Sequence, residues 1–244
     1  MKNKIIIIGI IISVIILIAS SYFLIRDYID YKRSKNSNNE LINKVVIQNN
    51  EDLEEPSGYI KIDWDELNKI NEDIIGWITI ENTNINYPIL KDSDRLYYLK
   101  HTFDKNYNRN GSIFTINENP FEDKETVIYG HNMRNGIMFS ELNNYLEESF
   151  FIKHSNFMIY TKEENYSATV FSCYVMSEQD EENNIKSLDY FDKINYYQEQ
   201  SKYKITDIGE IKKIVKLSTC SYAGNHTVPT DKRCFVVAKL EKIN

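Results

Sequence analysis

The chain begins with one long apolar run. Residues 5–25 are dominated by isoleucine, leucine and valine and contain no charged side chain. At the rise of an α-helix this run extends for about 30 Å, the thickness of the hydrocarbon core of a bilayer. A cleaved signal peptide is the alternative, but residues 19–21 form a poor cleavage site that more apolar residues follow. We therefore predict a transmembrane anchor at 5–25, behind a short N-terminal segment at 1–4.

The segment after the apolar run is polar. Residues 26–56 are rich in asparagine and charged groups and carry only a weak apolar pattern, which predicts a partly helical juxtamembrane stalk. A folded domain is expected at 57–244. Its first element is a short helix at 64–70, where apolar side chains recur at helical spacing and Asp63 stands in the N-cap position.

Short apolar runs separated by turn-forming residues then dominate the chain. Their alternation and their β-branched and aromatic content are typical of strands. Eight such runs are found, at 76–80, 85–90, 111–116, 126–129, 156–160, 166–176, 211–219 and 234–240. This number of strands in one domain predicts a mainly β fold, either a closed barrel or a sandwich.

Two segments between these strands have helical spacing. The first is a short helix at 139–146, with Ser140 as its expected cap. The second, at 187–203, is inserted directly before the strand at 211–219. The predicted domain is therefore a β-structure with one helical insert.

Charge and composition narrow the classes of partner. After residue 35, acidic side chains outnumber basic ones by 34 to 23, and no basic cluster with interleaved aromatic residues occurs. Nucleic acid is therefore not an expected partner. The 18 tyrosines and the few glycines and prolines favour a folded domain over a disordered chain.

The chain contains three cysteines, and two of them have an ordinary structural explanation. Cys173 and Cys234 lie within predicted strands, where a cysteine usually acts as a small buried hydrophobic residue. A disulfide between these two is possible, and the sequence leaves it open. No cysteine or histidine spacing indicates a metal site, and no cofactor is implied.

Cys220 differs from the other two because it ends a strand. Alternation along 211–219 places Val215 and Leu217 on the core face, so Ser218 and Cys220 point out of the core. Arg233 begins the next strand, and pairing of the two strands would bring it near Cys220. His131 follows the strand at 126–129.

A thiol, an imidazole and a guanidinium at strand ends can support acyl transfer through a thioester. Nearby positive charge favours the thiolate of Cys220, and His131 can protonate a departing amine and deprotonate an incoming one. Arg233 can donate to the oxyanion of a tetrahedral intermediate, and the backbone N–H of Ser221 is a second candidate donor. Each residue alone would more often be structural, so spacing by itself leaves the function open.

The residues around these three positions resemble those of sortases, the membrane-anchored cysteine transpeptidases of Gram-positive bacteria. Residues 217–220 followed by Arg233 are similar to the sortase signature. Residues 129–142 resemble the region around the catalytic histidine of class B sortases, and residues 74–78 resemble their first barrel strand. The helical insert is a further class B trait. The resemblance covers residues 60–241.

The resemblance implies an eight-stranded sortase-type β-barrel and assigns roles to its residues. Cys220 would be the nucleophile, His131 the general acid and base, and Arg233 the group that stabilises the oxyanion and the substrate. Ser218 and Ser221 are the expected substrate-binding residues. The connection from Ser221 to Lys232 is longer than expected for class B and contains His226, which is a rival base.

The implied reaction joins a protein to the cell wall. Cleavage after Thr in a C-terminal sorting motif of a surface protein would leave a thioester on Cys220, and an amine of peptidoglycan or of its lipid-linked precursor would then accept the protein. The resemblance implies a single-pass cell-membrane protein with its N-terminus inside and its catalytic domain outside. The charge pattern favours the opposite orientation. Only Lys2 and Lys4 precede the span, more basic residues follow it, and the more basic side usually lies in the cytoplasm.

Two other functions stay open. A cysteine L,D-transpeptidase of the cell wall would carry its cysteine in a Ser-His-Gly-Cys context, which this sequence lacks. A membrane-anchored binding module would hold Cys220 and His131 for structural reasons only. The reactivity of the Cys220 thiol distinguishes this last possibility from an enzyme.

Overall fold

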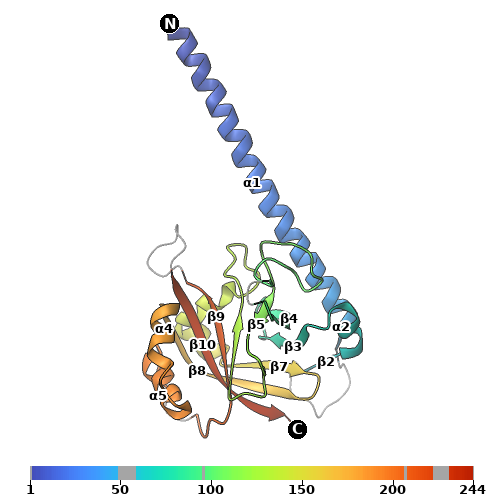
Figure 1. Cartoon of the computed structure of the whole chain (residues 1–244), viewed down its shortest axis with the longest axis vertical. Coiled ribbons are helices and arrows are strands. Elements are labelled where there is room, and N and C mark those ends of the chain that lie inside the picture. The colour runs from blue at the N-terminus through green and yellow to red at the C-terminus, as the bar shows by residue number, and fades with distance from the viewer. Residues whose placement is uncertain (1, 49–58, 95–96, 206–207, 222–230, 244) are drawn as a thin grey trace.

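The structure, a computed structural model, describes residues 2–48, 59–94, 97–205, 208–221 and 231–243. These residues form a β-barrel with short helices on its outside. One long helix at the N-terminal end of the chain projects away from the barrel (Figure 1).

The projecting helix, α1 (Lys2–Val45), contains the whole predicted membrane anchor. It is long and apolar enough to cross a membrane, and its isoleucines are exposed between residues 5 and 25. The helix does not end at residue 25 but continues through most of the predicted stalk. It is followed by β1 (Val46–Gln48), which pairs antiparallel with β2 (Ile60–Ile62), a pair that the sequence pattern did not predict.

The C-terminal part of α1 packs against the barrel. Leu41 and Val45 are buried in one hydrophobic cluster with Trp77 of the barrel. The Asn38 amide donates to the carbonyl of Asn86 at 3.1 Å. The expected domain boundary at residue 57 lies outside the described residues, but side chains of α1 already belong to the core of the domain.

A short helix leads into the barrel. Helix α2 (Trp64–Ile70) has the predicted bounds, and its N-cap is confirmed because Asp63 Oδ1 accepts a hydrogen bond from the Glu66 N–H at 2.9 Å. This bond satisfies one of the backbone donors that the first turn of a helix leaves unpaired.

Among the described residues, eight strands close into a barrel in the order β10-β8-β7-β3-β4-β5-β6-β9. The predicted eight-stranded barrel is thereby confirmed. The pairs β4–β5 and β6–β9 are parallel and the other neighbours are antiparallel. The strands are β3 (Ile74–Thr79), β4 (Asn86–Lys91), β5 (Ile113–Thr115), β6 (Glu125–Tyr129), β7 (Asn156–Thr161), β8 (Asn165–Ser177), β9 (Ile214–Cys220) and β10 (Lys232–Ile243).

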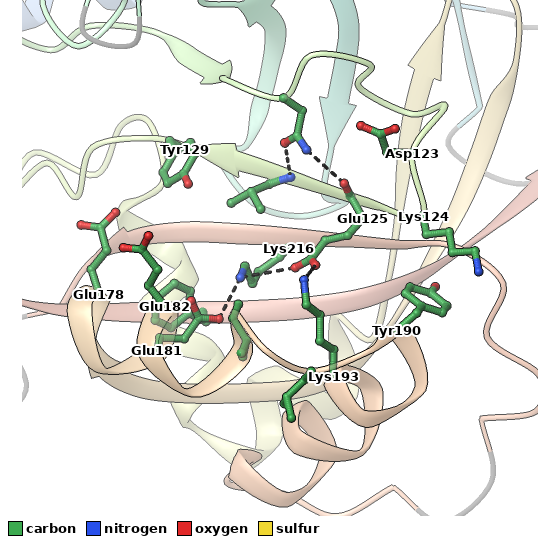
Figure 2. A pocket seen from close by; sticks show the side chains of 15 residues that line it. Asp123, Lys124, Glu125, Tyr129, Glu178, Glu181, Glu182, Tyr190, Lys193 and Lys216 are labelled. Atoms are coloured by element: carbon green, nitrogen blue, oxygen red, sulfur yellow. Dashed lines mark hydrogen bonds and ion pairs between the residues drawn. The ribbon is translucent and has the colours of Figure 1, made fainter.

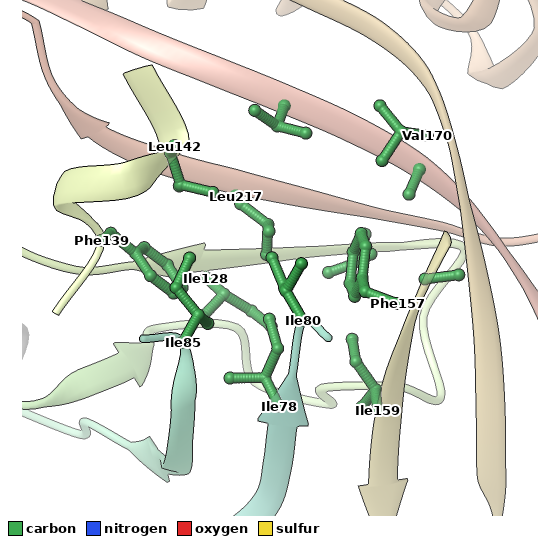
Figure 3. Close-up of a cluster of buried hydrophobic side chains, with 14 of the residues drawn as sticks. Ile78, Ile80, Ile85, Ile128, Phe139, Leu142, Phe157, Ile159, Val170 and Leu217 are labelled. Carbon is green, nitrogen blue, oxygen red and sulfur yellow. The ribbon is translucent and has the colours of Figure 1, made fainter. Parts of the chain in front are cut away.

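Apolar side chains from every part of the barrel fill its interior. Figure 3 shows members of this buried cluster from five strands, namely Ile78 of β3, Ile128 of β6, Phe157 of β7, Val170 of β8 and Leu217 of β9. Alternation along β9 is confirmed, since Val215 and Leu217 belong to this interior cluster. The opposite face of β9 therefore points out of the barrel.

The helix predicted at 139–146 is present as a 3₁₀ helix, η1 (Ser140–Leu146), which is followed by α3 (Glu148–Lys153). The predicted cap was wrong. Phe139 occupies the N-cap position without a side-chain capping bond. Ser140 is instead the first residue of η1, and its buried hydroxyl has no hydrogen-bond partner among the described residues.

The helical insert consists of α4 (Glu178–Ile185) and α5 (Tyr190–Gln200), which lie on the outside of the barrel next to β8 and β10 (Figure 1). The insert therefore begins earlier than the predicted residue 187. Helix α4 is highly charged and lacks the apolar period that reveals a helix in a sequence. The Ser177 hydroxyl caps it by accepting from the Asp180 N–H at 3.1 Å.

Candidate active site

Strand β9 places Cys220 at the edge of a groove. Cys220 is the last residue of β9 and is partly exposed, whereas the residues before it in the strand are buried. In the antiparallel pair β9–β10 it lies directly opposite Arg233. The predicted pairing of these two residues across the ladder is confirmed.

His131 reaches the same groove through the parallel pair β6–β9. Tyr129 is paired with Ser218, and the Gly130 N–H donates to the Ser218 carbonyl at 3.2 Å. The hydroxyl of Thr219 donates to the Gly130 carbonyl at 2.8 Å. A Cβ atom at Gly130 would lie 2.4 Å from Cδ1 of Ile113 and 2.8 Å from Cγ of Phe139, so glycine leaves room here for these two buried side chains.

Together the three predicted catalytic residues line one groove with a volume of about 350 Å³. Its walls are partly apolar, with Tyr129 stacked on Phe114 at a ring distance of 5.7 Å. Burial raises the pKa of Tyr129 to about 12, so its phenol stays protonated at neutral pH. The lining consists of Leu99, Phe114, Ile116, Tyr129, Gly130, His131, Glu178, Ser218, Thr219, Cys220 and Arg233.

A backbone carbonyl fixes the imidazole of His131. Nε2 of His131 lies 2.9 Å from the carbonyl oxygen of Leu99. A carbonyl oxygen can only accept, so Nε2 carries the proton of this hydrogen bond. In the neutral ring Nδ1 is then the nitrogen that can take up a proton.

The position of the Leu99 carbonyl depends in turn on Gly111. The backbone of Gly111 has a φ of +60°, and a Cβ atom there would lie 2.6 Å from the Tyr98 carbonyl oxygen and 2.7 Å from that of Leu99. Only glycine combines this conformation with such a close contact. Gly111 therefore permits the loop geometry that holds His131.

Two asparagines hold the backbone of the cysteine. The carbonyl of Cys220 accepts from the Asn132 amide at 2.8 Å and from the Asn143 amide at 3.2 Å. The sequence pattern predicted a role for neither. For Asn132 the sequence held one signal, its position directly after His131. Asn143 lies on η1, far from Cys220 in the sequence, and only the fold brings it to the Cys220 carbonyl.

The two predicted substrate-binding serines differ in their surroundings. Ser218 lines the groove, is only 2% exposed, and its hydroxyl has no hydrogen-bond partner among the described residues. Ser221 is buried, and its backbone N–H donates to the Lys232 carbonyl at 2.9 Å. A role of this N–H as an oxyanion donor would require that bond to break. The rival base His226 lies outside the described residues.

The other two cysteines are separated from the groove. Cys173 and Cys234 are buried in the barrel interior, and both thiols are free, so the disulfide that the sequence left open is not formed. Burial raises the pKa of the Cys173 thiol to about 12 and raises the pKa of Cys234 well above its usual range. Neither thiol is available as a nucleophile at neutral pH.

A second pocket, of about 550 Å³, lies between β6, β9 and the helical insert (Figure 2). At its floor the ammonium group of Lys216 pairs with Glu181 at 2.8 Å and with Glu125 at 3.3 Å. Burial acts to raise the pKa of Glu125, but the charges of Lys216 and Lys193 outweigh it, and the pKa lies below its ordinary value. This buried network attaches the insert to β9.

Fold and groove together place a thiol, an imidazole and a guanidinium at strand ends of a closed barrel, the arrangement expected of a cysteine enzyme. The sortase domain family matches residues 78–241. The chain belongs to the sortase family, and sortases are cysteine transpeptidases.

The named relatives are class B sortases. Sortase B of Listeria monocytogenes is 36% identical over 170 residues, which cover 67% of this chain and 69% of that protein. Sortase B of Staphylococcus aureus is 32% identical over 243 residues, which cover 96% of each chain. The predicted class is thereby confirmed.

Solved structures of sortase B share the fold. A Bacillus anthracis sortase B in complex with AAEK1 has a TM-score of 0.71 at 32% identity and covers 88% of this chain and 100% of its own. A Staphylococcus aureus sortase B–substrate complex has a TM-score of 0.65 at 33% identity and covers 74% of this chain and 85% of its own.

The first prediction concerns the thiols. Iodoacetamide at about pH 8 should modify Cys220 in the folded protein and leave Cys173 and Cys234 unmodified, because only Cys220 is exposed and the other thiols are buried and protonated. Peptide mapping by mass spectrometry measures this, with denatured protein as the control for full labelling. Equal labelling of all three thiols in the folded protein would contradict the description of the site.

The second prediction concerns the support of His131. Gly111→Ala should lower kcat about 10- to 100-fold, because the new methyl group displaces the Leu99 carbonyl that orients the imidazole. Gly209→Ala is the matched control, since Gly209 has a similar φ of +62° and a Cβ atom there would meet only the Lys239 ammonium group, at an ordinary contact distance of 3.9 Å. The control should lose stability by about 1–2 kcal/mol from backbone strain and keep its kcat. Equal kcat values for the two variants would count against the role of Leu99.

Proposed function

We propose that this protein cleaves a C-terminal sorting motif after Thr, holds the acyl fragment as a thioester on Cys220, and transfers it to an amine of the cell wall. The observation that carries this proposal is the position of Cys220 opposite Arg233 in a groove that also contains His131. The membership in the sortase family supports the same reaction.

The proposed acylation step begins with the thiolate of Cys220. It attacks the carbonyl carbon of Thr, so that a carbon–sulfur bond forms, and collapse of the tetrahedral intermediate breaks the carbon–nitrogen bond. The departing amine takes a proton from Nδ1 of His131, since Nε2 is bonded to the Leu99 carbonyl. In the second step an incoming amine forms the new amide, returns a proton to His131 and releases the Cys220 thiolate.

Arg233 and Ser218 would contact the substrate. Arg233 stays charged and lies beside Cys220, where its guanidinium can donate to the oxyanion that forms on the Thr carbonyl. The buried hydroxyl of Ser218 lacks a partner, and a polar group of a bound peptide would supply one. Substrate binding by Ser221 stays a prediction.

The proposal includes a location. Helix α1 would cross the cell membrane once, with the N-terminus inside and the barrel outside, where surface proteins and peptidoglycan or its lipid-linked precursor are found. Protease added to intact cells should then degrade the barrel and leave a membrane-bound fragment that contains residues 5–25. Full protection of the barrel in intact cells, with digestion after lysis, would contradict this orientation.

The reaction itself is tested with internally quenched peptides that carry Thr at the scissile position and vary at the flanking positions, with and without amine acceptors. The parent enzyme should cleave a subset of the peptides, and mass spectrometry should find the acyl adduct on Cys220. Cys220→Ala should abolish cleavage, whereas the control Cys173→Ala should retain it. Cleavage by Cys220→Ala would refute the proposal. An unreactive Cys220 together with no cleavage of any peptide would favour a binding module.

A further inference from the structure

We infer that Glu178, the first residue of the helical insert, is a positioning residue for Arg233. The inference rests on the proposed function, because it assigns to Glu178 the task of holding the guanidinium that would contact the oxyanion. Glu178 Oε2 lies 3.1 Å from a terminal guanidinium nitrogen of Arg233, and both side chains line the groove that contains Cys220.

The fold fixes Glu178 at this point in three ways. The pairing of β8 with β10 sets Met176 opposite Arg233, so that β8 ends and α4 begins beside the guanidinium. The Ser177 hydroxyl caps α4 and defines its first turn. The Glu178 N–H donates at 3.4 Å to the carbonyl of Asp231, which is two residues before Arg233.

The ion pair with Glu178 orients the guanidinium of Arg233 and leaves several of its N–H donors unused. A guanidinium carries five N–H groups in a planar arrangement. One terminal nitrogen faces Glu178, and the other lies 3.4 Å from the Lys232 carbonyl oxygen. The remaining donors can point to a substrate that is bound at Cys220. A carboxylate that fixes the plane of the guanidinium therefore restricts where those donors point.

The ion pair is poorly suited to a purely structural role. The side chain of Glu178 is 51% exposed and that of Arg233 is 25% exposed. An ion pair with this degree of exposure contributes little to the stability of a fold. The Glu178→Gln variant should therefore fold normally. A change in its kinetics would then come from the altered position of Arg233 in the groove and not from a loss of stability.

Helix α4 offers a matched control. Glu182 lies one turn after Glu178, and Figure 2 shows both carboxylates beside Tyr129 at the same end of the second pocket. Glu182 forms no ion pair among the described residues. Glu182→Gln removes the same charge from the same helix and leaves the bond to Arg233 intact.

The position of Arg233 can be measured without any substrate. The chain contains six arginines, so the full-length protein labelled with ¹⁵N-arginine in detergent micelles gives few side-chain signals, and Arg233→Lys identifies the one that belongs to Arg233. Glu178→Gln should shift this signal and speed its hydrogen exchange, whereas Glu182→Gln should leave it unchanged. An Arg233 signal that is identical in the parent and in Glu178→Gln would overturn the inference.

Kinetics with a cleaved peptide test the consequence. Glu178→Gln should lower kcat about tenfold with KM changed by less than about twofold, because the donors of Arg233 matter most when charge develops on the carbonyl. Glu178→Asp should restore much of the loss, and Glu182→Gln should match the parent. An unchanged or raised kcat in Glu178→Gln would overturn the inference. If the parent cleaves no peptide, the proposed function fails and the arginine signal alone decides whether Glu178 positions Arg233.

Discussion

The site depends on the position of β9 between β6 and β10. Because β6 and β9 are parallel, their C-terminal ends meet at one edge of the barrel and bring His131 beside the end of β9. Because β9 and β10 are antiparallel, the end of β9 meets the start of β10 and brings Arg233 opposite Cys220. A slip of one residue in β9 would turn Cys220 into the barrel, so the packing of Leu217 and Val215 in the interior also sets the direction of the thiol.

Strand alternation in the sequence predicted part of this arrangement of Cys220, His131 and Arg233. The period of two along β9 was enough to place Cys220 and Ser218 outside the barrel and to expect Arg233 across the ladder. It could not predict the contact of His131 with Leu99, because Leu99 acts through its backbone carbonyl, which every residue type possesses. It also could not predict Asn143, whose approach to Cys220 depends on how η1 packs against the closed barrel.

The helical insert shows a second limit of sequence patterns. Helix α4 has no apolar stripe and buries a single isoleucine, Ile185, so charge contributes much of its attachment. The buried ammonium group of Lys216 pairs with Glu181 from the helix and with Glu125 from β6. Such charges are costly to bury and compensate one another only when all of them are in place. Lys216 lies in β9, so this network joins the insert, and with it Glu178, to the strand that ends at Cys220.

The pairing of Arg233 with Glu178 also has a consequence for catalysis on the proposed mechanism. The carbonyl of a bound peptide is neutral and acquires a full negative charge only in the tetrahedral intermediate. A guanidinium that a carboxylate already partly neutralises attracts anionic ligands less in the resting groove, yet it keeps donors for an oxyanion at short distance. The pair therefore lowers the attraction of Arg233 for any anion, the oxyanion included, and its benefit to the proposed reaction is the orientation of the remaining donors, whose hydrogen bonds strengthen when charge develops on the carbonyl.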